Sequence, residues 1–199
     1  MTLETSHQDT LLARRSFLGA TGLTLSGAAL ALLAGKDALA ASHAGAQPMG
    51  SQDVAILNVA LALEHEAINA YQIGAQSGLL QKPVLDVAVR FQSDHKEHRE
   101  ALIATIQKLG GTPAAERTLA EYAKLLKADT IKTQADILDL AARLELGAVN
   151  AYLGVIPSFK DAGLAKIAGR LAADETMHWT LLNNALARAL PAGGLPFGA

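Results

Sequence analysis

The chain of 199 residues contains no cysteine, and this absence excludes several kinds of chemistry. Disulfide bonds, thiolate metal sites and cysteine nucleophiles all require the missing thiol group. Any metal site in this protein must therefore use other ligands. The absence says little about the cellular compartment, because a protein without cysteine tolerates both oxidising and reducing conditions.

Aromatic residues are also scarce, at 4% of the chain, and runs of β-branched residues are few. Half of the residues are apolar, mainly Ala and Leu, which favours helices that pack closely on small side chains. The formal net charge is only −2, and no basic run follows the N-terminal segment, so nucleic acid and acidic membrane surfaces are poor partners. The sequence has no G-x-S-x-G motif and no Gly-rich phosphate loop.

Residues 1–40 have the organisation of an export signal. Residues 14–18 read Arg-Arg-Ser-Phe-Leu, a moderately apolar stretch follows over residues 19–34, and residues 38–40 offer a small-residue cleavage site. The paired arginines with the following Phe and Leu resemble the twin-arginine export signal, which implies a periplasmic or other extracytoplasmic location. A membrane anchor or a buried N-terminal helix is the alternative. The stretch is short and rich in Gly for a span, so no stable membrane insertion is expected after cleavage.

The remainder of the chain contains one motif twice. Residues 63–71, LEHEAINAY, recur as residues 144–152, LELGAVNAY, with Glu, Asn, Ala and Tyr in the same positions. Downstream, residues 94–98, DHKEH, correspond to residues 174–178, DETMH, with Asp and His retained. Two copies of a helical hairpin predict an all-α fold, an antiparallel four-helix bundle.

Start and stop signals place the helices of this bundle. The first begins near Ser51, and Thr133 with Asp136 forms a variant capping box at the start of the third. Short connections join the first helix to the second and the third to the fourth, so each pair should be antiparallel. The predicted segments are a linker (41–50), the bundle (51–190) and a disordered tail (191–199). The four long helices are predicted from Ser51 to Ser77, Pro83 to Leu109, Thr133 to Pro157 and Asp161 to about Leu190. One long crossover (110–132) joins the second to the third and contains a short predicted helix from Leu119 to Ala128.

Polar residues interrupt the apolar stripe of every long helix. In the fourth helix, Glu175 and His178 stand one turn apart within a stripe whose other members are apolar. Burying an ionised carboxylate without a partner costs several kcal/mol, and a metal ion is the commonest way to offset this cost for a Glu and His pair. Six residues occupy such inward positions: Glu64, His95, His98, Glu145, Glu175 and His178.

This set resembles the di-iron carboxylate bundles of the ferritin-like superfamily, in which two helices each give one Glu and two give Glu-x-x-His. The resemblance covers about residues 51–190. Glu64 and Glu145 match the single glutamates, Glu175 and His178 match one Glu-x-x-His, and His98 matches the histidine of the other. The resemblance implies one or two transition-metal ions. Iron or manganese suits these ligands, and zinc would accept them as well.

His95 departs from the family pattern, which has a bridging Glu at this position. The site then has three carboxylates instead of four, and Glu175 is left as the one bridging carboxylate. His95 could serve as an additional terminal ligand or as a proton donor. A dinuclear site stays plausible, and a mononuclear, mixed-metal or vestigial site competes with it.

Neighbouring residues allow two interpretations each. Tyr71 and Tyr152 could donate hydrogen bonds near the metal, but the favoured interpretation makes them core residues with the hydroxyl near a bundle end. Asp94 and Asp174 could accept from a ligand His on a neighbouring helix, or form surface salt bridges. His65 lies off the stripe and is expected on the flank or the surface.

Three functions fit these observations. The first is a redox protein that oxidises Fe(II) or Mn(II), or reduces oxygen or peroxide at the metal. The second is a non-enzymatic periplasmic bundle for stress response or metal sequestration, and the third is a metal-free scaffold. A monomer or small homo-oligomer is expected, because the tail offers no fifth helix for a storage cage.

Overall fold

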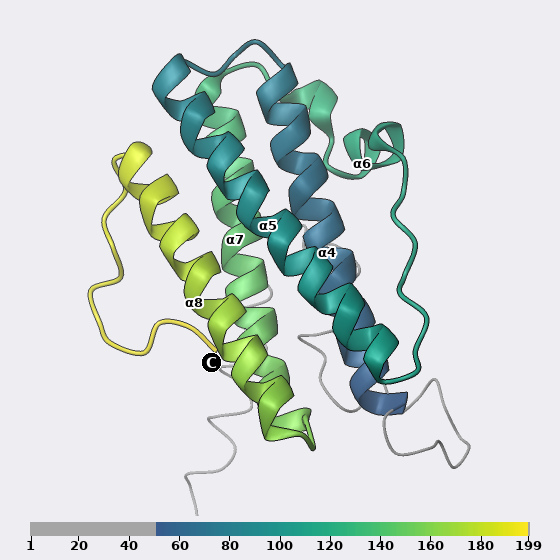
Figure 1. The fold of residues 1–199 in the computed structure, drawn as a ribbon. Coiled ribbons are helices and arrows are strands. Elements are labelled where there is room, and N and C mark those ends of the chain that lie inside the picture. Colours follow the sequence, from purple (N-terminus) through teal and green to yellow (C-terminus); the bar gives the residue numbers. More distant parts are fainter. Residues whose placement is uncertain (1–50, 199) are drawn as a thin grey trace, which may run out of the picture.

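The computed structural model describes residues 51–198 (Figure 1), and the predicted export signal and linker lie outside the described residues. Throughout this range every regular element is helical, and no strand occurs. The elements are α4 (Ser51–Gln76), α5 (Lys82–Lys108), α6 (Leu119–Leu125), η1 (Ala128–Thr130), α7 (Gln134–Val155), η2 (Ile156–Ser158) and α8 (Ala162–Ala185). The predicted all-α fold is confirmed. Between residues 51 and 198, no helix is both long enough and apolar enough to cross a membrane.

The four long helices form two hairpins. α4 packs along α5, α7 packs along α8, and the hairpins meet mainly through α4 and α7. Figure 1 shows the crossover between α5 and α7 following the outside of the bundle, and its short helix α6 packs against α4. This is the predicted arrangement of two hairpins joined by one long crossover.

Local signals explain most helix ends. Thr133 and Asp136 form the predicted capping box, in which each side chain accepts a hydrogen bond from the backbone N–H of the other. Removing such a cap typically costs about 1 kcal/mol. At the end of α5, Gly110 adopts a φ of +76°, a conformation that glycine reaches without steric cost. The N–H of Gly111 then bonds back to the carbonyl of Ile106 and closes the helix.

Two helices end earlier than the sequence predicts. α6 stops at Leu125 rather than Ala128 because Lys127 takes a left-handed conformation with a φ of +51°. α8 stops at Ala185 rather than about Leu190 because Ala187 takes a φ of +53°. Left-handed residues at helix ends are usually Gly or Asn, so neither stop carries the usual sequence signal.

The last residues of the described chain return to the bundle. The ring of Phe197 meets Trp179 of α8 edge to face, with ring centroids 5.2 Å apart. The backbone N–H of Gly198 donates to the side-chain oxygen of Asn150 on α7 at 2.8 Å. The segment after α8 therefore differs from a loose tail, although it forms no helix up to residue 198.

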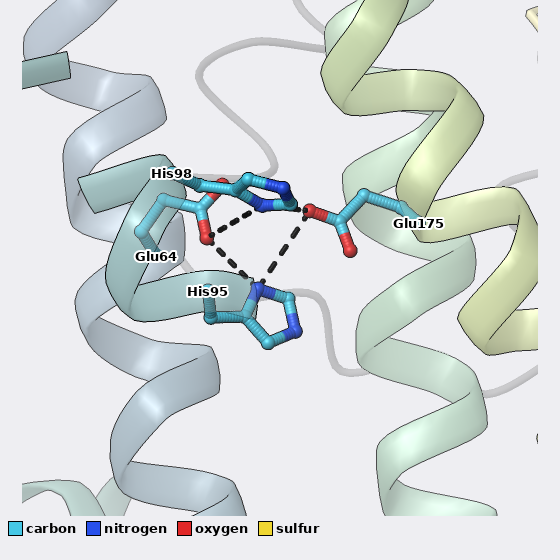
Figure 2. Close-up of side chains that lie close together, drawn as sticks. All are labelled: Glu64, His95, His98 and Glu175. Atoms are coloured by element: carbon cyan, nitrogen blue, oxygen red, sulfur yellow. Dashed lines mark hydrogen bonds and ion pairs between the residues drawn. The ribbon is translucent and has the colours of Figure 1, made fainter. Parts of the chain in front are cut away.

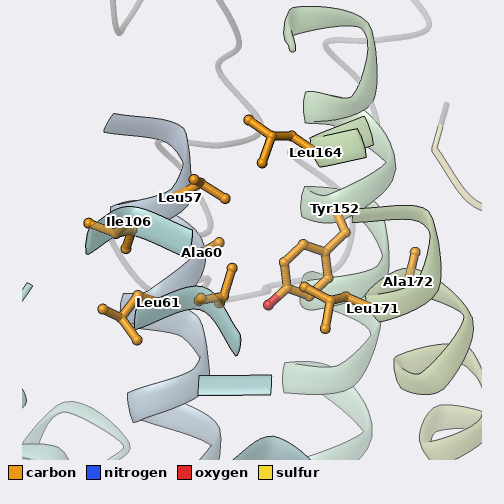
Figure 3. Close-up of a cluster of buried hydrophobic side chains, with 9 residues drawn as sticks. Leu57, Ala60, Leu61, Ile106, Tyr152, Leu164, Leu171 and Ala172 are labelled. Carbon is orange, nitrogen blue, oxygen red and sulfur yellow. The ribbon is translucent and has the colours of Figure 1, made fainter. Parts of the chain in front are cut away.

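The core contains three apolar clusters, and a polar layer lies between the two larger ones. Along α4, Leu57 and Leu61 belong to the first cluster, Tyr71 belongs to the second, and Glu64 lies between them. Truncating a fully buried residue such as Leu61 to Ala should cost about 2–5 kcal/mol. The first cluster, drawn in Figure 3, comprises Leu57, Ala60, Leu61, Leu102, Ile106, Tyr152, Leu164, Leu171 and Ala172.

Candidate metal centre

The polar layer contains the six predicted residues, and all six are buried. The buried positions of α8 follow steps of three and four residues, and this helical period turns Glu175 and His178 to the interior. The same period on α5 turns His95 and His98 inward. Glu175 is 0% exposed and His95 is 1% exposed, so these two groups are shielded from solvent.

Their ligand atoms form two overlapping groups of four, each with all atoms within 4.8 Å of one another. The first group is Glu64, His95, His98 and Glu175, and the second is His95, Glu145, Glu175 and His178. Figure 2 shows the first group, with side chains from α4, α5 and α8 that point toward one another. The structure thus brings together every residue that the sequence selected, and His95 and Glu175 belong to both groups.

The two carboxylate oxygens of Glu175 face different histidines. Its Oε1 lies 3.2 Å from Nδ1 of His98, and its Oε2 lies 3.1 Å from Nδ1 of His178. The carboxylate of Glu175 therefore faces one imidazole of each group. The bridging role that the family resemblance implies for Glu175 stays a prediction.

His95 also faces both groups. Its Nδ1 lies 2.8 Å from Oε2 of Glu64, and its Nε2 lies 3.2 Å from Oε1 of Glu145. The imidazole therefore spans the two single glutamates, and its Nδ1 also lies 3.7 Å from Oε1 of Glu175. The family pattern has a Glu here, and His95 provides one nitrogen to each side instead.

Two aspartates hold the outer nitrogens of the other histidines. Asp174 of α8 lies 3.2 Å from Nε2 of His98 on α5, and Asp94 of α5 lies 3.4 Å from Nε2 of His178 on α8. A carboxylate on Nε2 keeps a proton there, so that Nδ1 faces the interior and can bind a metal once its own proton is displaced. The interpretation that these aspartates contact a His on the neighbouring helix is confirmed. For Asp94 the alternative holds as well, because its other oxygen pairs with exposed Arg90 of α5 at 2.8 Å.

The two tyrosines of the duplicated motif also contact the cluster. Tyr71 donates a hydrogen bond to Glu145 at 2.5 Å, and Tyr152 donates to Glu64. The predicted core position of both tyrosines is confirmed, but the expected position of their hydroxyls near a bundle end is wrong. Each tyrosine reaches the glutamate of the other hairpin, and a reading of one helix at a time cannot detect this contact.

One residue differs from the sequence interpretation, and another has a partner that the sequence did not indicate. His65 is buried rather than exposed, because the crossover and α6 cover that face of α4. The ring of Phe91 stacks on His178, with centroids 3.9 Å apart. Phe91 precedes His95 by one helical turn on the same stripe, so its inward position was predictable, but its partner on α8 was not.

Without metal, opposite charges dominate the first group. Burial raises the pKa of Glu64, but hydrogen bonds and positive charge from His95 and His98 outweigh this and bring the pKa to about 2. Burial lowers the pKa of His98, but its contacts with Glu175 and Glu64 raise it to about 10. Glu64 is therefore an anion and His98 a cation over the neutral range.

The second group behaves in the same way. Burial lowers the pKa of His178, but its contacts with Glu145 and Glu175 raise it to about 9. Burial raises the pKa of Glu175 to about 6, against the opposing effect of the charge on His95. Glu175 is therefore the carboxyl of the layer that is most easily protonated.

Unpaired ligand atoms test whether this layer fits a cation. Among the described side chains, Nδ1 of His98, Oε2 of Glu145 and Oε1 of Glu175 are buried and lack a hydrogen-bond partner. The His98 and Glu175 atoms are close, but they are not aligned for a hydrogen bond. Buried polar atoms without partners are costly, and a metal ion would satisfy them. Carboxylate oxygen and imidazole nitrogen are suitable ligands for iron, manganese or zinc.

Comparison with known proteins agrees with this geometry. Residues 52–188 match the ferritin-like domain family. The structure resembles the crystal structure of a conserved hypothetical protein, rv2844, from Mycobacterium tuberculosis, with 25% sequence identity and a TM-score of 0.59 over 75% of this chain and 100% of that one. No curated protein matches the sequence. Because the family match covers most of the chain, including all six residues of the polar layer, the chain belongs to the ferritin-like domain family.

Proposed function

We propose that this protein is an exported metal-binding protein with a dinuclear centre of iron or manganese. Glu64 and His98 would hold one ion, Glu145 and His178 would hold the other, and Glu175 would join them. The observation that carries the proposal is the overlap of the two groups at Glu175, whose two oxygens face imidazoles of different groups.

The donor set also limits the chemistry. Such a metal pair would supply one-electron redox steps toward oxygen or peroxide. The protein itself provides two apolar clusters that restrict water on either side of the layer. Asp94 and Asp174 orient the two histidines, and the tyrosine hydroxyls hold the single glutamates in place. His95 offers a nitrogen to each side, as a ligand or as a proton donor.

Metal content provides the principal test. The protein without residues 1–40 would be purified from cells supplied with iron or manganese, and metal would be counted per chain. We expect about two ions per chain, with a large loss in Glu175→Ala and no change in Glu97→Ala, a control that alters an exposed residue of α5. One ion per chain that is lost in His95→Ala would indicate a mononuclear site. No metal under any supply would contradict the proposal.

Consumption of oxygen or peroxide then separates two versions of the proposal. A metal-loaded protein that consumes either oxidant, and loses this activity in Glu175→Ala, is a redox enzyme. A loaded protein that consumes neither is a metal-sequestering bundle of the stress-response kind.

A metal-free scaffold is the second candidate, and one observation favours it. The layer contains three carboxylates and three imidazoles, and the pKa of each of the three histidines is raised although burial opposes this. Three anions and three cations balance without any metal. In this case the polar layer would fix the register of the four helices, and removal of metal would leave the stability of the protein unchanged.

Export is proposed from the first 40 residues. The Arg-Arg-Ser-Phe-Leu segment at residues 14–18 supports the twin-arginine route. Replacing both arginines with lysine should retain the protein in the cytoplasm. The control is the same change at Arg117 and Arg170, two exposed residues of the described chain, and it should leave export unchanged. Cell fractionation measures the outcome, and unchanged export of the double variant would contradict this route.

A further inference from the structure

A second feature of the bundle is an apolar cavity of about 170 Å³ beside the polar layer. All four long helices contribute to its walls, together with Leu80 and Ile131 of the connecting segments. Exposed residues of α5 and α8, among them Pro83 and Leu181, line its outer part, where it opens to solvent. The residues that surround its inner part are Tyr71, Ala88, Phe91, Leu138, Ala141 and Leu182. Tyr71 and Asn184 are the polar residues among its described lining, and the hydroxyl of Tyr71 is engaged with Glu145.

The size and lining of the cavity limit its occupant. Water needs two to four polar partners in a buried site, and this lining offers almost none. An apolar cavity of about 150 Å³ stays dry and takes up benzene or xenon. The occupant with the best fit is therefore a small hydrocarbon-like molecule.

Two aromatic rings separate the cavity from the candidate metal centre. Phe91 lines the cavity and stacks on His178 at 3.9 Å between ring centroids. Tyr71 lines the cavity, packs edge to face on Phe91 at 6.1 Å, and bonds to Glu145. A molecule in the cavity would thus lie one ring away from two residues of the polar layer.

We propose that this cavity binds one small apolar organic molecule, of about the size of benzene. The binding itself follows from the cavity and does not require a metal. A further role of the cavity, to hold a substrate for the metal centre, rests on the proposed function.

Benzene titration of the purified protein tests the proposal by calorimetry. We expect saturable binding of one molecule per chain, with shifts in the ring-proton NMR signals of Tyr71 and Phe91. Ala141→Leu on α7 and Ala88→Leu on α5 each fill the cavity and should weaken binding at least tenfold. Ala104→Leu adds the same side chain at an exposed position of α5 and should leave the affinity unchanged.

Thermal unfolding shows whether Ala141→Leu and Ala88→Leu still fold. If one of them does not fold, the other still tests the proposal. Absence of saturable benzene binding, or equal affinity in a folded filling variant, would overturn the proposal. Uptake of xenon without benzene would also overturn it, because the space would then admit only gases. Repeating the titration after chelation separates this proposal from the metal proposal, because benzene should still bind. Benzene binding in a protein that takes up no metal under any supply would support this proposal and contradict the metal proposal alone.

Discussion

The hydroxyl of Tyr71 on α4 donates a hydrogen bond to Oε1 of Glu145 on α7, at 2.5 Å. Tyr152 on α7 donates to Glu64 on α4 in the reciprocal arrangement. Each tyrosine follows the glutamate of its own helix by seven residues, yet it contacts the glutamate of the other helix. The two hairpins are therefore tied together at two residues of the candidate metal centre.

Tyr71→Phe should destabilise the metal-free protein by about 1.5–3 kcal/mol, the usual contribution of a hydrogen bond to a charged group. Tyr152→Phe should have a similar effect, since its partner is equally buried. Urea unfolding measures both changes. Tyr122→Phe in α6 lies outside the polar layer and should not alter metal affinity. If neither Tyr71→Phe nor Tyr152→Phe changes the stability or the metal affinity, the two hydrogen bonds do not stabilise the protein or its metal site.

His95→Glu would restore the fourth carboxylate of the family pattern. In the metal-free protein four carboxylates would then face two histidines, so stability should fall because like charges are buried together. With metal present, the additional negative charge should strengthen binding of the second ion by roughly tenfold. Denaturant unfolding with and without metal measures the change in stability, and calorimetric titration measures the change in affinity for the second ion. Ser93→Glu adds the same carboxylate at an exposed position of α5 and should change neither the stability nor the metal affinity.

Asp174→Asn should weaken metal binding by about 10–100-fold, because the carboxylate orients His98 and increases its basicity. Asp94→Asn should act in the same direction through His178. Asp86→Asn is the matched control, because Asp86 pairs with Lys82 on the surface of α5. Equal metal affinity in all three variants would show that the aspartates act as ordinary surface charges.

Stability and metal affinity should respond to pH with opposite signs. The pKa values of His98 and His178 are raised to about 10 and about 9 from 6.5, so their contribution is complete below pH 6.5 and is lost as the pH rises through those values. One pKa unit corresponds to about 1.4 kcal/mol, and the metal-free protein should lose at least that much between pH 6.5 and 9.

Metal affinity should increase over the same range, because metal competes with protons for the histidine nitrogens. Denaturant unfolding of the chelated protein and metal titration at several pH values measure the two trends. A metal-free protein whose stability rises toward pH 9 would contradict the charge pairing described for His98 and His178.

Local patterns predicted the parts of this protein that depend on one helix at a time. The 3.6-residue period turns Glu64, His95 and Glu175 inward whatever their neighbours are, so the helices and the six cluster residues could be named in advance. The duplication likewise predicted two hairpins and the crossover between them. Where the local signal was absent, as at Ala187 at the end of α8, the predicted boundary was wrong.

The sequence alone determined the helices, the hairpin duplication, the inward faces and the replacement of a bridging Glu by His95. Only the tertiary structure decided which groups meet: Tyr71 with Glu145, Asp94 with His178, and both nitrogens of His95 with different glutamates. The physical reason is that partners across a bundle depend on the axial shift and rotation of one helix against another. Side-chain packing along the whole contact sets these quantities, and no short segment of sequence contains them.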